Sequence, residues 1–359
     1  MQLSTTLIFL ALASSSLALR SPGFRDHRLS KGAILEAQRA SNASLEQRSG
    51  KYNLIKSYEG KTFFKDMMFF TGNDPSHGSV DYVDHDTAHE SGLIGMMDGM
   101  AMMRVAPHHS GIHRSVRPST DISFTEGLII LDAMHHPTGC GTWPSFFTVP
   151  IDSNWPEDGE IDIIEGVGGM NRNKYSIHTT AGCRVVQDQM IMHAAKLTGG
   201  QNCDAEATSD EGCAISGTQN GDFGVEYNAN HGGVHVLDWH HKTGIRIFFF
   251  PRGSIPQDIE DGHPEPNSWG SPRAAWPATH CPPDQFFKKH TGTFTSTLCG
   301  TWSGNDAVWH GTQPGQQKSC AAHTGHDSCE SWLKSGKAEM DEAYWQIKSL
   351  RIYQITRRH

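Results

Sequence analysis

The stretch VHVLDWHHKTGIRIFFF, residues 234–250, carries the pattern on which the predicted fold rests. Two runs rich in β-branched and aromatic residues, 234–239 and 245–250, flank Lys242-Thr243-Gly244, and a short connection that contains glycine is typical of a β-hairpin. Apolar residues of the second run recur at every other position, which is the period of a strand. The stretch therefore predicts two antiparallel strands joined by a turn.

Short runs of the same kind, separated by Gly, Pro, Asn and Asp, follow one another from Tyr52 to Gln354. Besides the hairpin they comprise residues 62–70, 127–132, 159–165, 174–179 and 344–353. Regular strands with little helical patterning predict an all-β sandwich of two antiparallel sheets, with the irregular stretches 199–230 and 252–283 as loops at its ends. No domain boundary is visible after Tyr52, so residues 51–359 are predicted to form a single domain.

The composition of the 359-residue chain narrows the classes of protein to consider. The formal net charge is −9, whereas proteins that bind nucleic acids usually carry a basic excess. No apolar run reaches the roughly 18 residues that a membrane helix needs. No H-E-x-x-H, C-x-x-C, P-loop or G-x-S-x-G motif occurs, so the sequence predicts no metal and no other cofactor. We expect a monomer that binds neither nucleic acid nor membranes.

The first fifty residues are predicted to lie outside the sandwich. Residues 7–19 are apolar or small, and Ser16-Leu17-Ala18 resembles the A-x-A site of a secretory signal peptide, which predicts cleavage after residue 18. Residues 19–50 are polar and predict a pro-segment or a flexible tail. Eight cysteines, an even number in an exported chain, predict up to four disulfides whose pairing stays open.

The segment WPEDGEIDIIEG, residues 155–166, contains three acids in a strand pattern that slips by one residue. Glu160 and Asp162 fall on one face of a regular strand, but the next position on that face is an isoleucine and the third acid is Glu165. A β-bulge near Ile163-Ile164 would bring all three carboxylates to the same face. Three carboxylates on one face repel one another, so such a row indicates a shared proton or a functional site.

The aromatic residues around this acid row favour carbohydrate chemistry. Trp143, Phe147 and Trp155 flank the acids, and aromatic faces stack on sugar rings. Two carboxyl groups beside such rings can serve as nucleophile and as general acid/base in the cleavage of a glycosidic bond. The alternative is a solvated edge strand with alternating acids, which has no need of the flanking aromatic residues.

Six ordered blocks of sequence resemble glycoside hydrolase family 16, and in particular its fungal laminarinase-like endo-β-1,3(4)-glucanases. They are GCGTWP at 139–144, GEIDIIEGV at 159–167, IHTTAGC at 177–183, FPR at 250–252 followed by Ile255-Pro256, LCGTW at 298–302 and AYW at 343–345. The resemblance covers nearly all of the chain from Tyr52 to Gln354. It implies a concanavalin A-like jelly roll with a substrate cleft across its concave sheet, so that residues 51–359 would form a single catalytic domain.

The same resemblance implies roles for the three acids. Glu160 corresponds to the nucleophile, Glu165 to the general acid/base, and Asp162 to the electrostatic partner between them. The charges of Glu160 and Asp162 would raise the pKa of Glu165 and keep that carboxyl protonated until it acts as an acid.

Five further residues are predicted to bind substrate: Trp143, Phe147, Trp155, His178 and Trp302. Trp155 is expected to be a platform for a sugar ring, whereas Trp143 fits a platform or a core position, and the exposure of Trp302 stays open. His178 matches a family position near the acid/base, and a purely structural histidine is the alternative. Phe147 stands where tryptophan is usual in the family, which predicts weaker stacking there.

Together with the signal segment, the resemblance implies a secreted endo-acting hydrolase of β-1,3-glucan or mixed β-1,3/1,4-glucan that uses a retaining double-displacement mechanism. Two alternatives share the fold. One is a β-glucan-binding lectin-like protein, which would normally lack one or more of the acids, and the other is a cell-wall transglycosylase. The expected partner in each case is a β-glucan polysaccharide, and the expected location is extracellular, in the medium or at the cell wall.

Overall fold

The computed structural model describes residues 51–106 and 113–356. The predicted signal peptide, residues 1–18, and the predicted pro-segment, residues 19–50, lie outside the described residues, so both stay predictions. Within the described ranges, no helix is long and apolar enough to cross a membrane.

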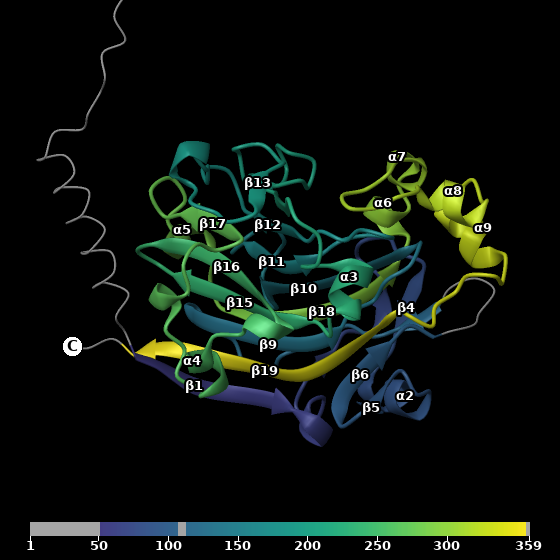
Figure 1. Cartoon of the computed structure of the whole chain (residues 1–359), viewed down its shortest axis with the longest axis horizontal. Helices are drawn as coiled ribbons and strands as arrows, with labels where there is room; N and C mark the ends of the chain where they lie inside the picture. Colours follow the sequence, from purple (N-terminus) through teal and green to yellow (C-terminus); the bar gives the residue numbers. More distant parts are fainter. Residues whose placement is uncertain (1–50, 107–112, 357–359) are drawn as a thin grey trace, which may run out of the picture. The chain divides into compact units, whose positions relative to one another are not determined.

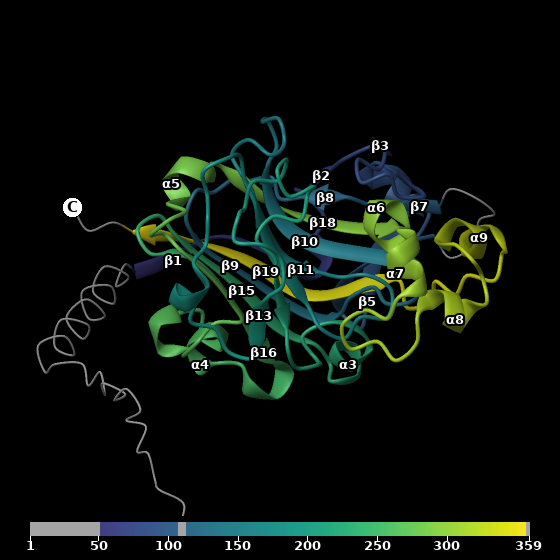
Figure 2. The same ribbon diagram turned by 90° about the horizontal axis from the view of Figure 1, so that it is seen from above.

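The described residues form two large antiparallel sheets. The first has the order β17 (Ala274–Pro277), β16 (Gly244–Pro251), β15 (Gly233–His240), β9 (Gly127–His135), β19 (Tyr344–Thr356), β6 (Met100–Arg104) and β5 (Ile94–Met97), and β1 (Lys51–Glu59) also pairs with β19. The second has the order β13 (Ala195–Leu197), β14 (Ile215–Gly217), β12 (Lys174–His178), β11 (Glu160–Glu165), β10 (Thr142–Pro150), β18 (His290–Leu298), β8 (Pro118–Ser119) and β2 (Met68–Phe69). Figure 1 shows β15, β9 and β19 side by side in the first sheet, and Figure 2 shows β10 beside β18 in the second.

A small third sheet joins β3 (Gly72–Asn73), β4 (Val80–Tyr82) and β7 (His113–Ser115). Its β4–β7 pair is parallel, whereas every strand pair of the two large sheets is antiparallel among the described residues. The arrangement confirms the predicted all-β sandwich of two antiparallel sheets.

The hydrophobic core lies between the two large sheets. The predicted hairpin is confirmed, since β15 and β16 pair along their whole length, and its opposed residues Leu237 and Ile247 are fully buried. They belong to the same hydrophobic cluster as Ile161 and Ile177 of the second sheet. Because apolar side chains of both inner faces leave water together, this cluster holds the sheets face to face.

One predicted strand is wrong over most of its length. Within residues 62–70 only β2 is a strand, and the 3-10 helix η1 (Gly60–Thr62) leads into a turn that contains Phe63 and Phe64. Both phenylalanines are buried in the core. Neighbouring residues of a strand point to opposite faces, so the turn is what brings both rings into the same core.

The sequence predicts loops at 199–230 and 252–283, but both stretches also contain regular elements. The first holds β14 and α3 (Gly224–Ala229), and the second holds η3 (Arg252–Ser254), α4 (Gln257–Glu260), η4 (Pro266–Ser268) and β17. β14 joins β12 to β13, and β17 pairs with β16. These strands are only three and four residues long, and they form because they satisfy backbone groups of a neighbouring strand that local sequence does not reveal.

Four disulfides pair all eight cysteines, as the even count predicted: Cys140–Cys320, Cys183–Cys281, Cys203–Cys213 and Cys299–Cys329. The helices α6 (Gly300–Ser303) and α7 (Asp306–His310) follow β18 along the chain. The first disulfide attaches α8 (Cys320–Thr324) to the segment before β10, and the last attaches α9 (Cys329–Lys334) to the end of β18. The remaining helices of the described part are α2 (His85–Glu90), η2 (Gln187–Gln189) and α5 (Pro283–Phe286).

Candidate active site

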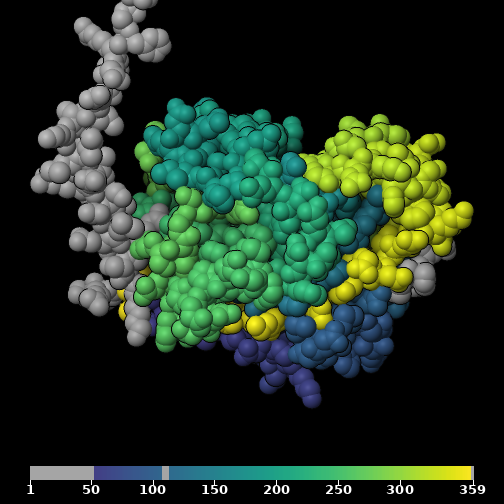
Figure 3. All heavy atoms as spheres, viewed as in Figure 1, coloured from purple at the N-terminus to yellow at the C-terminus, as the bar shows by residue number. Residues whose placement is uncertain are grey.

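A cleft of about 850 Å³ lies on the face of the second sheet that is turned away from the core. Side chains of β10, β11, β12 and β18 line it, together with residues of the segments 75–77, 153–155, 209–211 and 301–308. Figure 3 shows the surface hollowed between the teal and the yellow-green segments. The volume lies in the range of pockets that enclose a ligand.

The acid row on β11 contains the predicted β-bulge. Glu165 pairs with Ser145 and Asp162 with Phe147, so two residues of β11 lie between partners that are only two positions apart on β10, and the register shifts there. The isoleucines at 163 and 164 are both fully buried. The extra residue lets β11 turn these apolar side chains inward while Glu160 and Glu165 both line the cleft.

Asn173, which the sequence analysis missed, holds this bulge in place. Its side-chain amide donates to the carbonyl oxygen of Ile163 at 2.9 Å, and its side-chain oxygen accepts from the backbone N–H of Glu165 at 2.9 Å. Asn173 is fully buried. It therefore satisfies two backbone groups that the bulge removes from the sheet ladder, and its only sequence signal is a polar residue directly before a strand.

Neutral donors orient the two outer carboxylates. The indole nitrogen Nε1 of Trp143 donates to Oε1 of Glu165 at 3.0 Å, and the Ser145 hydroxyl lies 3.3 Å from the same oxygen. On the other side, Nε1 of Trp155 donates to Oε2 of Glu160 at 2.5 Å. Each glutamate thus has a tryptophan partner that fixes the direction of its carboxyl group.

Asp162 lies beneath the cleft rather than in its lining, with 2 % of its surface exposed. Its Oδ2 accepts from the hydroxyl of Ser176 at 2.7 Å and pairs with Nε2 of His178 at 3.0 Å. Both partners are on β12, where Ser176 is opposite Asp162 and His178 is opposite Glu160. His178 is therefore a structural partner of Asp162 and also a residue of the cleft lining.

The cluster combines the contact between Asp162 and His178 with two carboxyl groups whose pKa values are raised. Burial and the charge of Asp162 raise the pKa of Glu160 to about 8, and the same causes raise the pKa of Glu165. Burial opposes the charge of Asp162, but hydrogen bonds from His178 and Ser176 hold the pKa of Asp162 below its ordinary value. Burial also opposes the charge of His178, but its hydrogen bond to Asp162 raises the pKa of His178 to about 8.

These electrostatics differ from the sequence prediction in one respect. We predicted a raised pKa for Glu165 with Glu160 ionised, whereas the pKa of Glu160 is raised as well. The spacing of acids along a strand reports their mutual repulsion but not their burial, and burial is the larger cause here. Because the carboxyl groups interact, a proton gained or lost belongs to the cluster as a whole.

All five predicted substrate-binding residues line the cleft: Trp143, Phe147, Trp155, His178 and Trp302. Trp155 is 45 % exposed and presents a free ring surface, whereas Phe147 is buried in the floor. Trp143 and Trp302 are half-buried and form an edge-to-face pair with ring centroids 5.8 Å apart. The structure thus brings the predicted residues together, and their roles in binding and catalysis stay predictions.

Two cations in the lining escaped the sequence analysis. The guanidinium of Arg117 lies 5.5 Å from the ring centroid of Phe147, and the ammonium of Lys174 lies 4.4 Å from that of Trp302. Lys174 had a detectable signal, because it precedes His178 by four positions and so shares its face of the strand. Arg117 comes from a distant segment with no strand pattern to mark it.

Gly159 places the start of the acid row. Its backbone φ is +78°, and a β-carbon there would lie 2.4 Å from a ring carbon of Phe287 and 2.6 Å from the carbonyl oxygen of Phe286. Only glycine adopts this conformation without strain and leaves room for α5. Close packing and backbone conformation, rather than a role in catalysis, therefore require glycine at position 159.

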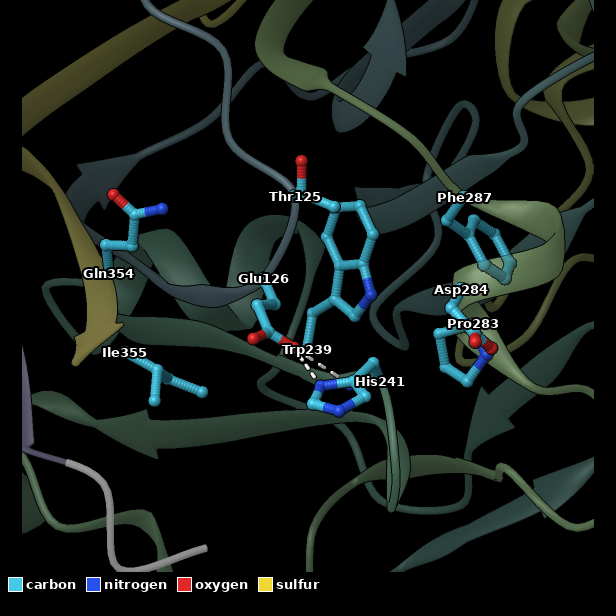
Figure 4. A pocket seen from close by; sticks show the side chains of 9 residues that line it. All are labelled: Thr125, Glu126, Trp239, His241, Pro283, Asp284, Phe287, Gln354 and Ile355. Carbon is cyan, nitrogen blue, oxygen red and sulfur yellow. Dashed lines mark hydrogen bonds and ion pairs between the residues drawn. The ribbon is translucent and has the colours of Figure 1, made fainter. Parts of the chain in front are cut away.

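A second cavity, of about 490 Å³, contains none of the predicted site residues. Figure 4 shows its lining, in which Glu126 contacts the ring of His241. Gln354 and Ile355 of β19 lie on one side of this cavity, and Asp284 and Phe287 lie on the other. The lining offers no row of carboxylates and no exposed aromatic face, since Trp239 is buried.

Paired carboxylates in a cleft lined by tryptophans, on a jelly-roll sandwich, are typical of glycoside hydrolases. The model of the XgeA-like catalytic GH16 domain matches residues 67–353. A protein named probable glycosidase from Schizosaccharomyces pombe is 38% identical over 309 residues, which cover 84% of this chain and 69% of that protein. The chain belongs to glycoside hydrolase family 16.

Other relatives agree with this assignment. A probable endo-1,3(4)-β-glucanase from Aspergillus clavatus is 35% identical over 91% of this chain, and the match spans 50% of that longer protein. Laminarinase 16A from Phanerochaete chrysosporium superposes with a TM-score of 0.75 at 28% identity, covering 85% of this chain and 100% of its own. An elongating family 16 β-1,3-glucosyltransferase superposes with a TM-score of 0.73 at 32% identity, covering 84% of this chain and 100% of its own.

Proposed function

We propose that the protein is a secreted endo-acting hydrolase of β-1,3-glucan or mixed β-1,3/1,4-glucan. The observation that supports it most is the bulged row of three carboxylates, two of which line a cleft together with tryptophans while Asp162 lies beneath it. The proposed substrates agree with the names of the relatives, several of which are endo-1,3(4)-β-glucanases. An open cleft beside the acids suits attack within a polysaccharide chain rather than at its end.

The cleavage proposed here is a double displacement. Glu160 attacks the anomeric carbon while Glu165 protonates the glycosidic oxygen, so the glycosidic bond breaks and a glycosyl ester forms on Glu160. Water then attacks the same carbon, gives a proton to Glu165 and releases the sugar with its original β configuration. The tryptophan donors keep both carboxyl groups aimed at the reacting bond.

Asp162 tunes the two glutamates in this scheme. Its charge, held by Ser176 and His178, keeps a proton on Glu165 for the first step. Glu160 must be ionised to attack, and the positive charge that develops at the anomeric carbon favours this form in the transition state. Because its pKa is raised to about 8, the Glu160 carboxyl first releases its proton to solvent, and the ionised form is the one that attacks.

A transglycosylase is the second candidate, because a 32% identical relative is a β-1,3-glucosyltransferase. Transfer follows the same first step, and a sugar hydroxyl replaces water in the second. A lectin-like protein is disfavoured, since all three acids are present and lie together.

Incubation with laminarin and with lichenan separates these functions. Hydrolysis predicts a rise in reducing ends, transfer predicts altered chain lengths with unchanged reducing ends, and binding alone predicts neither. NMR of the fresh products should detect the β anomer before mutarotation. An α product would indicate inversion and would contradict the roles of Glu160 and Glu165.

Secretion rests on the predicted signal peptide and on the four disulfides, which form in oxidising compartments. Mass spectrometry of the culture medium should find a mature chain that begins at or after Leu19. Recovery of the intact N-terminus from the cytosol would contradict this part of the proposal.

A further inference from the structure

Lys174 is a cation in the lining of the cleft, and the mechanism above does not use it. It begins β12 and shares a strand face with Ser176 and His178, the two partners of Asp162. Its side chain is half-buried, and its ammonium lies 4.4 Å from the ring centroid of Trp302, within the range of a cation–π contact. Lys174 is thus positioned by the same strand that positions the acid cluster.

The N–H donors of the Lys174 ammonium make no hydrogen bond within the described residues. Lys56, Lys288 and Lys348 each form an ion pair with an aspartate. Among residues 51–106 and 113–356, Lys174 forms no ion pair and no hydrogen bond, and its ammonium contacts the ring of Trp302. The aromatic ring of Trp302 attracts the charge of Lys174, but it does not accept a hydrogen bond in the way that a carbonyl or hydroxyl oxygen does. The three N–H groups of the ammonium therefore lack an oxygen acceptor. These groups are available to a ligand in the cleft.

Lys174 lies on the side of the cleft that belongs to Glu165. Its ring partner Trp302 packs against Trp143, whose indole donates to Glu165. Its charge also lowers the pKa of Glu165, against burial and Asp162, which raise it. The other titratable groups that interact with Glu165 are Glu160 and Asp162 on its own strand and His178 on β12, whereas β10 offers the neutral donors Trp143 and Ser145.

This position determines which sugar Lys174 meets. Glu165 protonates the oxygen of the leaving group, so a ligand group beside Glu165 and Trp302 belongs to the sugar on the leaving-group side of the scissile bond. That sugar offers several hydroxyl oxygens, which are good acceptors for an ammonium group. The face of Trp302 that Lys174 covers is at the same time withdrawn from stacking with a sugar ring.

We propose that Lys174 is a specificity-determining residue of this cleft, which donates hydrogen bonds to hydroxyl groups of the glucosyl unit on the leaving-group side. The inference rests on the proposed glucan hydrolysis and names a contact within it. In a transfer reaction the same contact would bind the acceptor sugar, because the acceptor enters from the side that the leaving group vacates.

The test compares two substrates that differ only in the leaving group. In a laminari-oligosaccharide the leaving group is a sugar, and in p-nitrophenyl β-laminaribioside it is an aryl group without hydroxyls. Lys174→Gln is expected to lower kcat/KM on the oligosaccharide by about tenfold, since hydrogen bonds to a charged group are lost. It should leave kcat/KM on the aryl glycoside within about twofold, and Lys174→Arg should restore part of the loss.

Lys196→Gln is the matched control. Lys196 on β13 and Lys174 on β12 are both opposite Ser216 of β14, but Lys196 is exposed and does not line the cleft. Its replacement should leave kcat/KM unchanged on both substrates.

Three results would overturn the inference. An equal loss on both substrates, each measured at the optimum of its own pH profile, would mean that Lys174 acts through Glu165 or through the fold. No loss on the oligosaccharide would exclude the contact. If the wild type cleaves neither laminarin nor the oligosaccharide, the proposed function itself is wrong. This result is seen in the wild type, so it is distinct from any loss seen only in the Lys174 variants.

Discussion

Two carboxylate–histidine pairs in this molecule differ in the number of carboxyl groups that surround them. Asp162 pairs with His178 under the large cleft, and Glu126 contacts His241 in the smaller cavity. Asp162 shares its strand with two further carboxyl groups whose pKa values are raised. The smaller cavity contains one other carboxylate, Asp284, which belongs to the separate helix α5.

The comparison teaches that a buried acid beside a histidine does not by itself mark an active site. Such a pair can satisfy two buried polar groups and add to stability. What distinguishes the cleft is the convergence of Glu160 and Glu165 on the same space, at a cost in repulsion and burial. We therefore expect substitutions at the cleft to affect cleavage strongly, and substitutions at the cavity to affect stability alone.

The largest effect is expected for Glu160→Ala, which should abolish glucan cleavage because no nucleophile remains to form the glycosyl ester. Reducing-end assays on laminarin measure this directly. Glu126→Ala removes the acid of the other pair and should retain cleavage. Comparable losses in the two variants would erase the distinction between cleft and cavity.

Glu165→Ala should lower the rate on glucan by about 10²–10⁴-fold, the usual contribution of a general acid/base. On an activated aryl glycoside, added azide should restore turnover, because a good leaving group needs no acid and azide needs no base. The product should be a β-glycosyl azide. Absence of rescue, with the variant folded, would assign Glu165 a role other than acid/base.

A smaller loss of activity is expected for Asp162→Asn, which removes a charge but no bond-forming group. Without that charge the pKa of Glu165 and that of His178 should both fall, because Asp162 raises each of them. The alkaline limb of the pH–rate profile should therefore move to lower pH, since Glu165 loses its catalytic proton earlier. An unchanged profile would mean that Asp162 does not control the acid/base.

The smallest expected effect is on stability and has opposite signs at the two sites. The pKa of Glu160 is raised from 4.5 to about 8, so the folded protein binds more protons than the unfolded chain between these values, and its stability decreases as pH rises through them. Glu160→Gln should thus raise the free energy of unfolding by roughly 1–3 kcal/mol at pH 8 and by little at pH 4, allowing for partial solvent exposure.

Glu126→Gln should instead lower the free energy of unfolding, by about 1 kcal/mol, since the contact with His241 loses its charge. Chemical denaturation of the two variants at pH 4 and pH 8 measures both effects. A destabilised Glu160→Gln at pH 8 would show that the acid row contributes to stability and would contradict the comparison.

Much of the fold could be predicted because strands leave a local signal. The hairpin of β15 and β16, and the position of the bulge in β11, follow from which residues alternate and where the alternation slips. Phe63 and Phe64 escaped prediction because two neighbouring aromatic residues fit a strand pattern as well as a turn, and only the core shared by both rings decides.

The amino-acid sequence by itself determined the acids, the aromatic residues near them and the family, because these depend on the identity and spacing of neighbours along the chain. Only the tertiary structure decided which cysteines pair and that Asn173 holds the bulge. It also decided that His178 forms a hydrogen bond with Asp162 and that Lys174 lies over Trp302 beside Glu165. The pKa of Glu160 belongs to the second group as well. The physical reason is that burial and contact join segments far apart in the chain, and no local pattern records which segments will meet.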